Sequence, residues 1–467
     1  MLNRIAFTLM AAALTFGTVA AQEVPSPLQT NADEGLFLII TDIHFDPFVD
    51  PSLVPKLDRS PVSQWASIMG QGPDQKFQGY GNDAGFPLMR SAIHAAAALN
   101  YQYDYVYYTG DYLSHGFGKN YQKYAGASPQ GIDSFAVKTT QFVSSLIKEA
   151  VGDIPVFGVL GNTDAACGDY QIAPSGNYVG GLADQWAELS QQPDRFPQFD
   201  TGGFYKVGHP TMADHDVIVL NNIFWTPRYS DSCNSEGGEP GDAMMSWLDW
   251  QLYETRQAGK KVQILMHVPP GVNAYSTARN TGVCAAKISL FWKEDYTSEF
   301  INLMRKYAGT VNYTFSGHTH MDSFAIIEAA DGTPLVASQI TPAVSPIFGN
   351  NPAFAVFQYN RQNGELKNSA TYYLENLPDT ESGRPAQWKA EYTYQDTYSV
   401  QNLTAKSRSA VAQQIKNDDK LRSRFIDLYA VSTKGSNPIT SDNWQAFTCA
   451  QSAVGKADFQ KCYCKGN

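Results

Sequence analysis

The stretch TFSGHTHMDS, residues 314–323, places two histidines one residue apart directly after Gly317, in a chain that has only 8 histidines. Just before it, the apolar or aromatic residues Val311, Tyr313 and Phe315 alternate with other residues. Alternation with a period of two is typical of a β-strand. The stretch therefore predicts a strand that runs into a tight turn and carries two imidazoles at its end.

Short β-like runs recur along the chain, and many of them end in Gly, Asp, Asn or His. Helical stretches at 87–99, 135–149 and 242–258 lie between several of these runs. Such alternation of strands and helices is typical of an α/β core. From about residue 401 the pattern turns helical, which predicts a small helical subdomain. The expected strands are 35–44, 105–111, 155–162, 216–222, 261–268 and 311–320.

The length and charge of the chain narrow the range of functions. A chain of 467 residues is long enough for one large domain or two ordinary ones, with a substantial core. Its formal net charge of −11 argues against a nucleic acid polymer as a partner, because neutralising phosphates requires an excess of Lys and Arg. This charge does not exclude a small phosphate ester held by metal ions.

The N-terminus has the pattern of a secretory signal peptide. Arg4 precedes an apolar run at 5–19, and the small residues Ala20 and Ala21 follow it. The run is shorter than the roughly 20 residues that a membrane span needs, and no later segment is apolar enough to span. We therefore expect cleavage near Ala20 or Ala21 and a secreted or periplasmic mature protein. An oxidising compartment favours disulfides among the 6 cysteines, whose pairing the sequence alone does not determine.

Histidines lie at or just after the ends of expected strands, beside Asp or Asn residues. In an open α/β sheet the ligand site lies beyond the carboxyl ends of the strands, so these side chains are expected to converge. Residues i and i+2 of an extended segment point to the same side. We therefore expect Asp42 with His44, and His318 with His320, to face one cleft. The full set comprises Asp42 and His44 in TDIH, Asp111 and His115 in TGDYLSH, Asn162 in LGNTD, His267 in LMHVPPG, and His318 and His320 in GHTH.

Seven of these side chains are candidate metal ligands. Seven ligands are too many for one tetrahedral metal but suit two metals that share a carboxylate. Imidazole mixed with carboxylate suits zinc, iron or manganese rather than calcium. A single DxH, GD or GN motif is usually a structural turn, so the prediction depends on the ordered set. Its members are Asp42, His44, Asp111, Asn162, His267, His318 and His320.

The order D-x-H, GD, GN, H, G-H-x-H resembles that of the calcineurin-like metallophosphoesterases. More narrowly, the chain is similar to the acid sphingomyelinase-like phosphodiesterases. The agreement runs from about residue 36 to 360 and continues more weakly through the C-terminal helices. The segments that carry the narrower resemblance are GYGNDAGFPLMRSA at 79–92, HVPPG at 267–271, GHTHMDSF at 317–324 and TPAVSPIFGNNPAFAVF at 341–357.

The resemblance implies an α/β fold in which helices flank a sandwich of two β-sheets, with a small C-terminal helical subdomain. It also implies a centre of two divalent metal ions, both Zn²⁺, that share Asp111. By motif, Asp42, His44, Asp111 and His320 would hold one ion, and Asp111, Asn162, His267 and His318 the other. The expected segments of the chain are a signal peptide at 1–21, an N-terminal segment at 22–34, a catalytic domain at 35–375 and a mainly helical C-terminal subdomain at 376–467.

The implied activity is hydrolysis of a small phosphodiester, with a sphingomyelin-like, phosphocholine or nucleotide substrate. The two metals would lower the pKa of a water between them, and the resulting hydroxide would attack phosphorus. Asn162 would offset charge on the phosphate oxygens, and His115 would protonate the departing oxygen or, alternatively, only orient a ligand. Two other functions stay open: a phosphomonoesterase or nucleotide pyrophosphatase, and a non-catalytic secreted binding protein stabilised by metals.

The chain departs from the family pattern at several points. Thr163 stands where the family usually has a histidine, which leaves His115 as the candidate proton donor. Asn82 stands where the family often has a cysteine. The first motif follows the expected cleavage site too closely for a saposin-like, lipid-binding module. The sequence does not indicate an oligomeric state.

The resemblance also implies part of the disulfide pattern. It pairs Cys233 with Cys284 and Cys449 with Cys462. It leaves the partners of Cys167 and Cys464 open.

Overall fold

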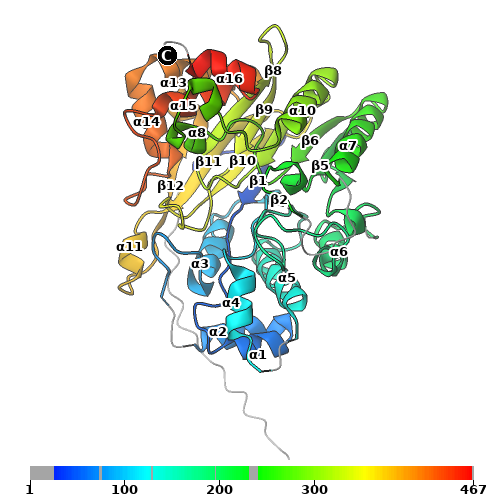
Figure 1. Cartoon of the computed structure of the whole chain (residues 1–467), viewed down its shortest axis with the longest axis vertical. Coiled ribbons are helices and arrows are strands. Elements are labelled where there is room, and N and C mark those ends of the chain that lie inside the picture. The colour runs from blue at the N-terminus through cyan, green and yellow to red at the C-terminus, as the bar shows by residue number, and fades with distance from the viewer. Residues whose placement is uncertain (1–25, 73–75, 128–129, 195, 231–239, 465–467) are drawn as a thin grey trace, which may run out of the picture.

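The computed structural model describes residues 26–72, 76–127, 130–194, 196–230 and 240–464. Two six-stranded β-sheets lie face to face, and helices surround them (Figure 1). This arrangement confirms the predicted α/β sandwich flanked by helices, with a helical region toward the C-terminus. The predicted signal peptide at 1–21 lies outside the described residues. Within the described ranges, no helix is long and apolar enough to cross a membrane.

The first sheet joins strands from both halves of the chain. β1, β2 and β3 are parallel neighbours. On the other side of β1, β10 pairs with β1, β11 with β10 and β12 with β11, all antiparallel. β12 comes from the segment 376–467, so this segment contributes a strand to the main sheet as well as helices. In sheet order, the strands are β12 (Trp388–Thr393), β11 (Leu366–Leu374), β10 (Ala353–Asn360), β1 (Glu34–Ile40), β2 (Tyr103–Tyr108) and β3 (Val156–Gly158).

The second sheet has four parallel strands in its centre. β5, β6, β7 and β9 are parallel, and β4 and β8 close the two edges as antiparallel neighbours. In sheet order, the strands are β4 (Tyr205–Gly208), β5 (His215–Val219), β6 (Lys261–Leu265), β7 (Val311–Ser316), β9 (Pro334–Ile340) and β8 (Ser323–Glu328).

Aromatic side chains from both sheets fill the space between them. The ring of Phe315 in β7 lies 5.6 Å from that of Phe37 in β1 and 5.5 Å from that of Tyr107 in β2, measured between centroids. The Tyr107 hydroxyl also donates to Oε1 of Gln263 in β6 at 2.7 Å. All four side chains are buried. The packing therefore fixes the two sheets relative to each other, and with them the loops at the strand ends.

Helices cover the sandwich on several sides. α3 packs against β10 and α6 against β3, while α7 packs against β6 and α10 against β8 and β9. The N-terminal helices are α1 (Val54–Arg59), α2 (Trp65–Gly70), α3 (Phe86–Ala97), α4 (Phe117–Tyr124), α5 (Ile132–Val151) and α6 (Asn177–Leu189). The central helices are α7 (Pro240–Gln257), α8 (Ala274–Arg279), α9 (Cys284–Lys287) and α10 (Glu294–Lys306). Short 3₁₀ turns are η1 (Val62–Gln64), η2 (Phe199–Thr201) and η3 (Asn222–Trp225).

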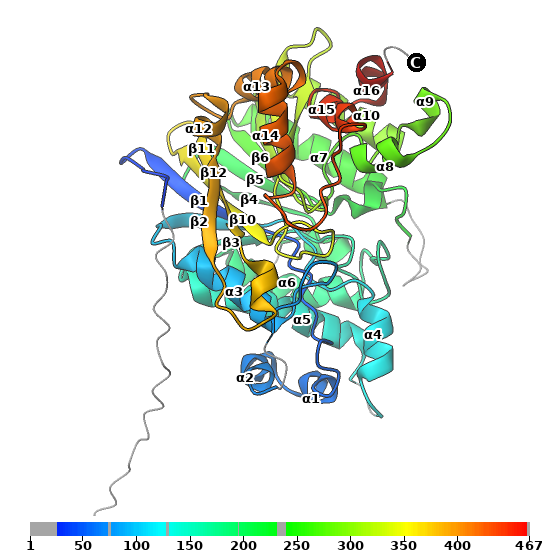
Figure 2. The same cartoon turned by 90° about the vertical axis from the view of Figure 1, so that its left-hand side faces the viewer.

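The C-terminal helices gather at one end of the molecule, where α13 to α16 lie beside the second sheet (Figure 2). α13 packs against β8 and β9, and α15 against β8 and α8. Buried apolar residues on α13 and α15 join them to the main core. The helices are α11 (Leu377–Thr380), α12 (Tyr394–Tyr398), α13 (Ala405–Asn417), α14 (Asp419–Tyr429), α15 (Trp444–Ser452) and α16 (Lys456–Tyr463).

Two disulfides tie down the last two helices. The predicted pair Cys449–Cys462 is confirmed and links α15 to α16. The predicted pair Cys233–Cys284 is wrong, because Cys284 at the start of α9 is bonded to Cys464, just after α16, with 5.8 Å between the Cα atoms. Cys167 is also disulfide-bonded. Cys233 lies outside the described residues.

The predicted strands that carry candidate ligands are present, but they end earlier than expected. The sequence predicts strands at 35–44, 105–111 and 311–320, whereas β1, β2 and β7 end at Ile40, Tyr108 and Ser316. The predicted strands included the candidate ligands because the sequence pattern does not show where hydrogen bonding between strands stops. The ligand candidates therefore lie in the loops that follow the strands.

Candidate metal centre

The loops after the strands of both sheets meet at one edge of the sandwich. The backbone N–H of Asp42, after β1, donates to the carbonyl of Gly110, after β2, at 3.0 Å. In the second sheet, the N–H of Gly317, after β7, donates to the carbonyl of His267, after β6, at 3.0 Å. The N–H of His318 then donates to Oδ1 of Asp42 at 3.0 Å and joins the two sheets. Residues 276 positions apart in the sequence thus lie in one site.

Five of the seven candidate ligands have a left-handed backbone. Their φ angles lie between 46° and 69°, a region that non-glycine residues seldom adopt. The expectation that Asp42 with His44, and His318 with His320, lie on extended segments is therefore wrong. Strained backbone of this kind is held only by surrounding structure and clusters at functional sites. The five residues are Asp42, His44, Asp111, His318 and His320.

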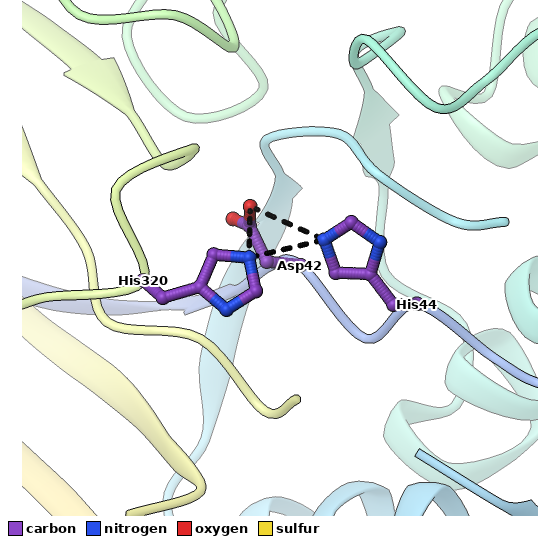
Figure 3. Close-up of side chains that lie close together, drawn as sticks. All are labelled: Asp42, His44 and His320. Atoms are coloured by element: carbon purple, nitrogen blue, oxygen red, sulfur yellow. Dashed lines mark hydrogen bonds and ion pairs between the residues drawn. The ribbon is translucent and has the colours of Figure 1, made fainter. Parts of the chain in front are cut away.

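Asp42, His44 and His320 form one cluster, with ligand atoms within 4.8 Å of one another (Figure 3). The two Nε2 atoms of His44 and His320 are 3.1 Å apart, and they lie 3.9 and 3.5 Å from Oδ1 of Asp42. All three side chains are buried. The cluster combines residues from the loops after β1 and β7.

Asp111, His267 and His318 form a second cluster, whose ligand atoms also lie within 4.8 Å of one another. Oδ2 of Asp111 is 3.1 Å from Nε2 of His267 and 3.3 Å from Nε2 of His44, so this oxygen lies between the two clusters. Oδ1 of Asn162 lies 3.1 Å from Nε2 of His267 and 2.8 Å from Nδ1 of His318. All seven candidate ligands thus lie in two adjoining groups.

The hydrogen bonds of the imidazoles fit a bound cation. Nδ1 of His44 lies 3.0 Å from the Leu113 carbonyl, and Nδ1 of His320 lies 3.3 Å from the Ser345 carbonyl. A carbonyl only accepts, so Nδ1 carries the proton in both rings and each neutral Nε2 presents a lone pair. Two lone pairs then face each other across 3.1 Å beside a carboxylate. Such a set of acceptors without a donor suits a metal ion.

The pKa values of His44 and His318 agree with this donor set, whereas those of Asp42 and His267 are raised. Burial lowers the pKa of His44 to about 4 and that of His318 to about 3, and it raises the pKa of Asp42 to about 7. Burial also acts to lower the pKa of His267, but the nearby charge of Asp111 outweighs it and raises this pKa to about 9. Most of these imidazoles are therefore neutral at pH 7, as metal ligation requires.

His115 lies beside the first cluster and is paired with Asp83. Its ring stacks on that of His44 with 4.4 Å between centroids, and its Nδ1 is 3.0 Å from Oδ1 of Asp83. Burial acts to lower the pKa of His115, but the hydrogen bond to Asp83 and the charge of Asp83 outweigh it and raise this pKa above 6.5. Ser345 donates to the same carboxylate at 3.2 Å. Sequence reasoning missed Asp83, because no spacing pattern relates it to His115, 32 positions away.

Thr163 and Asp164 hold the loops of the centre in place. The backbone N–H of Thr163 donates to Oδ1 of Asp111 at 2.8 Å, which leaves Oδ2 for the two clusters. The buried carboxylate of Asp164 accepts from the N–H groups of Asp111 at 2.9 Å, Tyr112 at 2.7 Å and Gly161 at 2.7 Å. Residue 163 thus orients the shared carboxylate in this chain.

Asp169 and Arg228 orient Asn162. Nδ2 of Asn162 donates to Oδ1 of Asp169 at 2.7 Å, so Oδ1 of Asn162 must face the histidines. Arg228 pairs with the other Asp169 oxygen at 2.8 Å, and its guanidinium lies 4.3 Å from the centroid of the Tyr170 ring. These contacts were also not predicted from the sequence. The proximity of Asp169 to the GN motif was its only local signal.

A cavity of about 660 Å³ opens onto the centre. Asp111, Asn162, His318, His320 and His115 line it, while Asp42, His44 and His267 lie deeper behind them. Binding sites for small molecules typically have volumes of about 300–1,000 Å³. The cavity is therefore large enough for a small organic ester whose phosphate lies at the two clusters.

Comparison with known proteins agrees with the motifs and the fold. Residues 35–322 match the calcineurin-like phosphoesterase family, and residues 333–466 match the acid sphingomyelin phosphodiesterase C-terminal region. The chain belongs to the calcineurin-like phosphoesterase family, and the predicted resemblance is confirmed. It is a metal-dependent phosphoric ester hydrolase.

Several known proteins align with most of the chain. The chain is 27% identical to the acid sphingomyelinase-like phosphodiesterase 3b of Homo sapiens over 413 residues, covering 86% of this chain and 84% of that protein. It is 24% identical to a cyclic GMP-AMP phosphodiesterase of Rattus norvegicus, and the alignment covers 92% of this chain and 91% of that protein. It is also 24% identical to sphingomyelin phosphodiesterase B of Dictyostelium discoideum, and the alignment covers 94% of this chain and 66% of that protein.

Proposed function

We propose that the protein is a secreted phosphodiesterase that uses two divalent cations, both Zn²⁺, to hydrolyse a small phosphodiester. The observation that carries the proposal is the position of Asp111 Oδ2, 3.3 Å from His44 in one cluster and 3.1 Å from His267 in the other. A single carboxylate between two groups of imidazoles is suited to a pair of metal ions. The donor set of imidazole and carboxylate suits zinc, iron or manganese, and the family resemblance favours zinc among them. The disulfides favour an oxidising compartment.

Each residue of the centre has a role that follows from its position. The two cations, when bound, would lower the pKa of water and neutralise charge on the phosphate. Asn162 has two N–H groups on Nδ2, and Asp169 accepts from one, so the other can donate to a phosphate oxygen. His115, held by Asp83 at the cavity wall, would donate a proton to the departing alkoxide. One cation would be held by Asp42, His44, Asp111 and His320, and the other by Asp111, Asn162, His267 and His318.

The charges around the cavity favour a diester over a monoester. A phosphomonoester carries up to two negative charges near neutral pH, whereas a diester carries one. Among the described residues that line the cavity, Arg228 is the only Lys or Arg, and Asp169 already pairs with it. Beyond the metal ions, the site thus offers no unpaired Lys or Arg for the second charge of a monoester.

A comparison of two esters tests this proposal. Purified protein loaded with Zn²⁺ is assayed with bis(p-nitrophenyl) phosphate and with p-nitrophenyl phosphate, and kcat/KM is measured for both. We expect kcat/KM to be at least about 10-fold higher for the diester, which corresponds to tenfold tighter binding of its transition state. A preference for the monoester would favour the phosphomonoesterase alternative. Absence of turnover with both esters would count against the proposed phosphodiester substrate.

Replacing Asp83 with Asn is expected to move the alkaline limit of activity to lower pH. A general acid must be protonated, so activity is lost as the pH rises through the pKa of His115, which lies above 6.5 in the native protein. The Asp83→Asn variant would lack the charge that raises this pKa, whereas the burial that lowers it would remain. The measurement is a profile of kcat/KM against pH with an alkyl phosphodiester, for both proteins. An unchanged alkaline limb would show that His115 is not the acid.

A further inference from the structure

The main chain orients three of the four predicted histidine ligands. In each of the three, Nδ1 lies between 2.8 and 3.3 Å from a backbone carbonyl, which only accepts. Nδ1 therefore carries a proton, and Nε2 is the nitrogen that faces the clusters. The orientation of these rings depends on the fold of the backbone rather than on a neighbouring side chain. The three ligands are His44, His267 and His320.

His318 is oriented in the opposite sense. Its Nδ1 is the nitrogen that faces the other ligands, because it lies 2.8 Å from Oδ1 of Asn162. When Nδ1 presents its lone pair to a cation, the proton is on Nε2. Nε2 lies 3.5 Å from the hydroxyl oxygen of Tyr170, which accepts a long hydrogen bond from it. The support of this ligand is therefore a side chain rather than the backbone.

Tyr170 is fixed in the same loop as Asn162. Its side chain is buried, and its backbone is left-handed, with a φ angle of 60°. Such strained backbone is held only by surrounding structure and clusters at functional sites. Here the N–H of Tyr170 donates to the carbonyl of Asn162 at 2.7 Å, and its carbonyl accepts from the N–H of Ser230 at 3.1 Å. The hydroxyl is thus held in place relative to Asn162 as well as to His318.

The guanidinium of Arg228 links the supports of two ligands. It lies 4.3 Å from the centroid of the Tyr170 ring and pairs with Asp169 at 2.8 Å. Asp169 in turn accepts from Nδ2 of Asn162. Arg228 therefore connects the residue that supports His318 with the residue that orients Asn162. Both of these ligands belong to the predicted set of the second cation, and neither belongs to that of the first.

We propose that Tyr170 is a positioning residue that sets the affinity of the second cation site alone, and that Arg228 holds Tyr170 in place. Tyr170 accepts from Nε2–H of His318 and so keeps the lone pair of Nδ1 pointed at the cation. Partners of this kind orient metal ligands, and their mutation typically lowers metal affinity or activity 10–100-fold. The inference rests on the proposed function and adds to it a residue that controls one of the two ions.

The variant Tyr170→Phe removes the hydroxyl and keeps the ring beside Arg228. Tyr121→Phe is the matched control, because the Tyr121 side chain is also buried and its hydroxyl donates to Asp58, outside the cavity. Chelator-stripped proteins are titrated with Zn²⁺ by calorimetry, and the dissociation constants of the two ions are determined. We expect Tyr170→Phe to raise one constant about 10-fold and to leave the other unchanged. Tyr121→Phe should change neither.

A second variant acts from the exposed side of the same support. Arg228→Met keeps the stem of the side chain and removes the charge that contacts Tyr170 and Asp169, so it should weaken the same ion. Arg279→Met is its matched control. Arg279 lies 5.1 Å from the centroid of the Tyr275 ring in a similar pair, but it does not line the cavity, so both constants should stay unchanged.

The variant Asp42→Asn identifies which ion is affected. Asp42 belongs to the first cluster only, so this substitution should weaken the first ion. Tyr170→Phe should weaken the other one. Equal weakening of both ions by Tyr170→Phe, weakening of the ion that depends on Asp42, or two unchanged constants would overturn the inference.

Excess zinc separates support of a ligand from contact with the substrate. With both sites saturated, kcat of Tyr170→Phe should return to near that of the wild type, because mass action refills a weakened site. A loss that persists with two ions bound would overturn the inference, since Tyr170 would then act on the substrate. Absence of hydrolysis in the wild type would count only against the proposed function, because calorimetry needs no turnover. Fewer than two bound ions in the wild type would overturn both.

Discussion

Replacing Asp111 with Asn is expected to remove most of the phosphodiesterase activity together with most of the bound metal. Oδ2 of Asp111 lies between the two clusters, so the substitution weakens both cation sites at once. Mutating a residue that only supports a metal ligand typically lowers metal affinity or activity 10–100-fold. For Asp111, which would bind both ions, we therefore expect activity to fall at least about 100-fold. The measurements are kcat/KM with bis(p-nitrophenyl) phosphate and metal content by elemental analysis.

The control for Asp111→Asn is the same substitution at another buried carboxyl. Asp58 is 1% exposed and accepts from Tyr121 and Gln130, outside the cavity. Asp58→Asn should reduce thermal stability but keep both metal ions and the turnover of the folded protein. Near wild-type turnover in Asp111→Asn would refute the shared-carboxylate arrangement. Equal losses in the two variants would show that the effect comes from misfolding.

Replacing His115 with Ala is expected to slow an alkyl phosphodiester by about 100-fold or more, within the range of 10²–10⁴ for general acids. The same variant should hydrolyse a p-nitrophenyl ester at a rate much closer to that of the wild type, because p-nitrophenolate leaves without a proton. Metal content should stay near that of the wild type, since His115 is in neither of the two groups formed by the seven predicted ligands. It lies with His44 and Asp83 in a third set of close ligand atoms. The measurements are kcat for both esters and elemental analysis.

His94 is the matched control for His115. It is exposed on α3 and does not line the cavity, so His94→Ala should leave both rates unchanged. An equal loss of rate on the alkyl and p-nitrophenyl esters in His115→Ala would assign His115 to positioning of the phosphate. Loss of metal in this variant would instead place His115 among the residues that support a cation.

The sequence pattern was sufficient to predict an α/β core and the set of residues at the strand ends, whereas the two-sheet sandwich was implied by the family resemblance. Alternating hydrophobic runs predict the strands, and seven candidate ligands at or just after their ends lie within two adjoining groups in the structure. Local pattern is informative here because the strands are buried and their ends are marked by short polar motifs. The backbone of the ligands was not predictable, because the left-handed angles of Asp42 and His320 depend on contacts with distant loops.

The contacts that orient the site could not be read from the sequence. Asp83 meets His115 only after the loop before α3 folds against the loop after β2, and Asp169 meets Asn162 through a turn with no distinctive motif. The disulfide of Cys284 was predicted wrongly, since its partner Cys464 is 180 positions away and is brought close only by packing of the C-terminal helices. Long-range contacts of this kind depend on the whole fold rather than on local pattern.

In the proposed function, phosphodiester hydrolysis depends on two cations held by the seven predicted ligands. The most direct measurement is a titration of chelator-stripped protein with Zn²⁺, in which hydrolysis of bis(p-nitrophenyl) phosphate and bound zinc are followed together. We expect activity to rise to a plateau at two bound ions per chain. Full activity at one bound ion, or in the stripped protein, would contradict it.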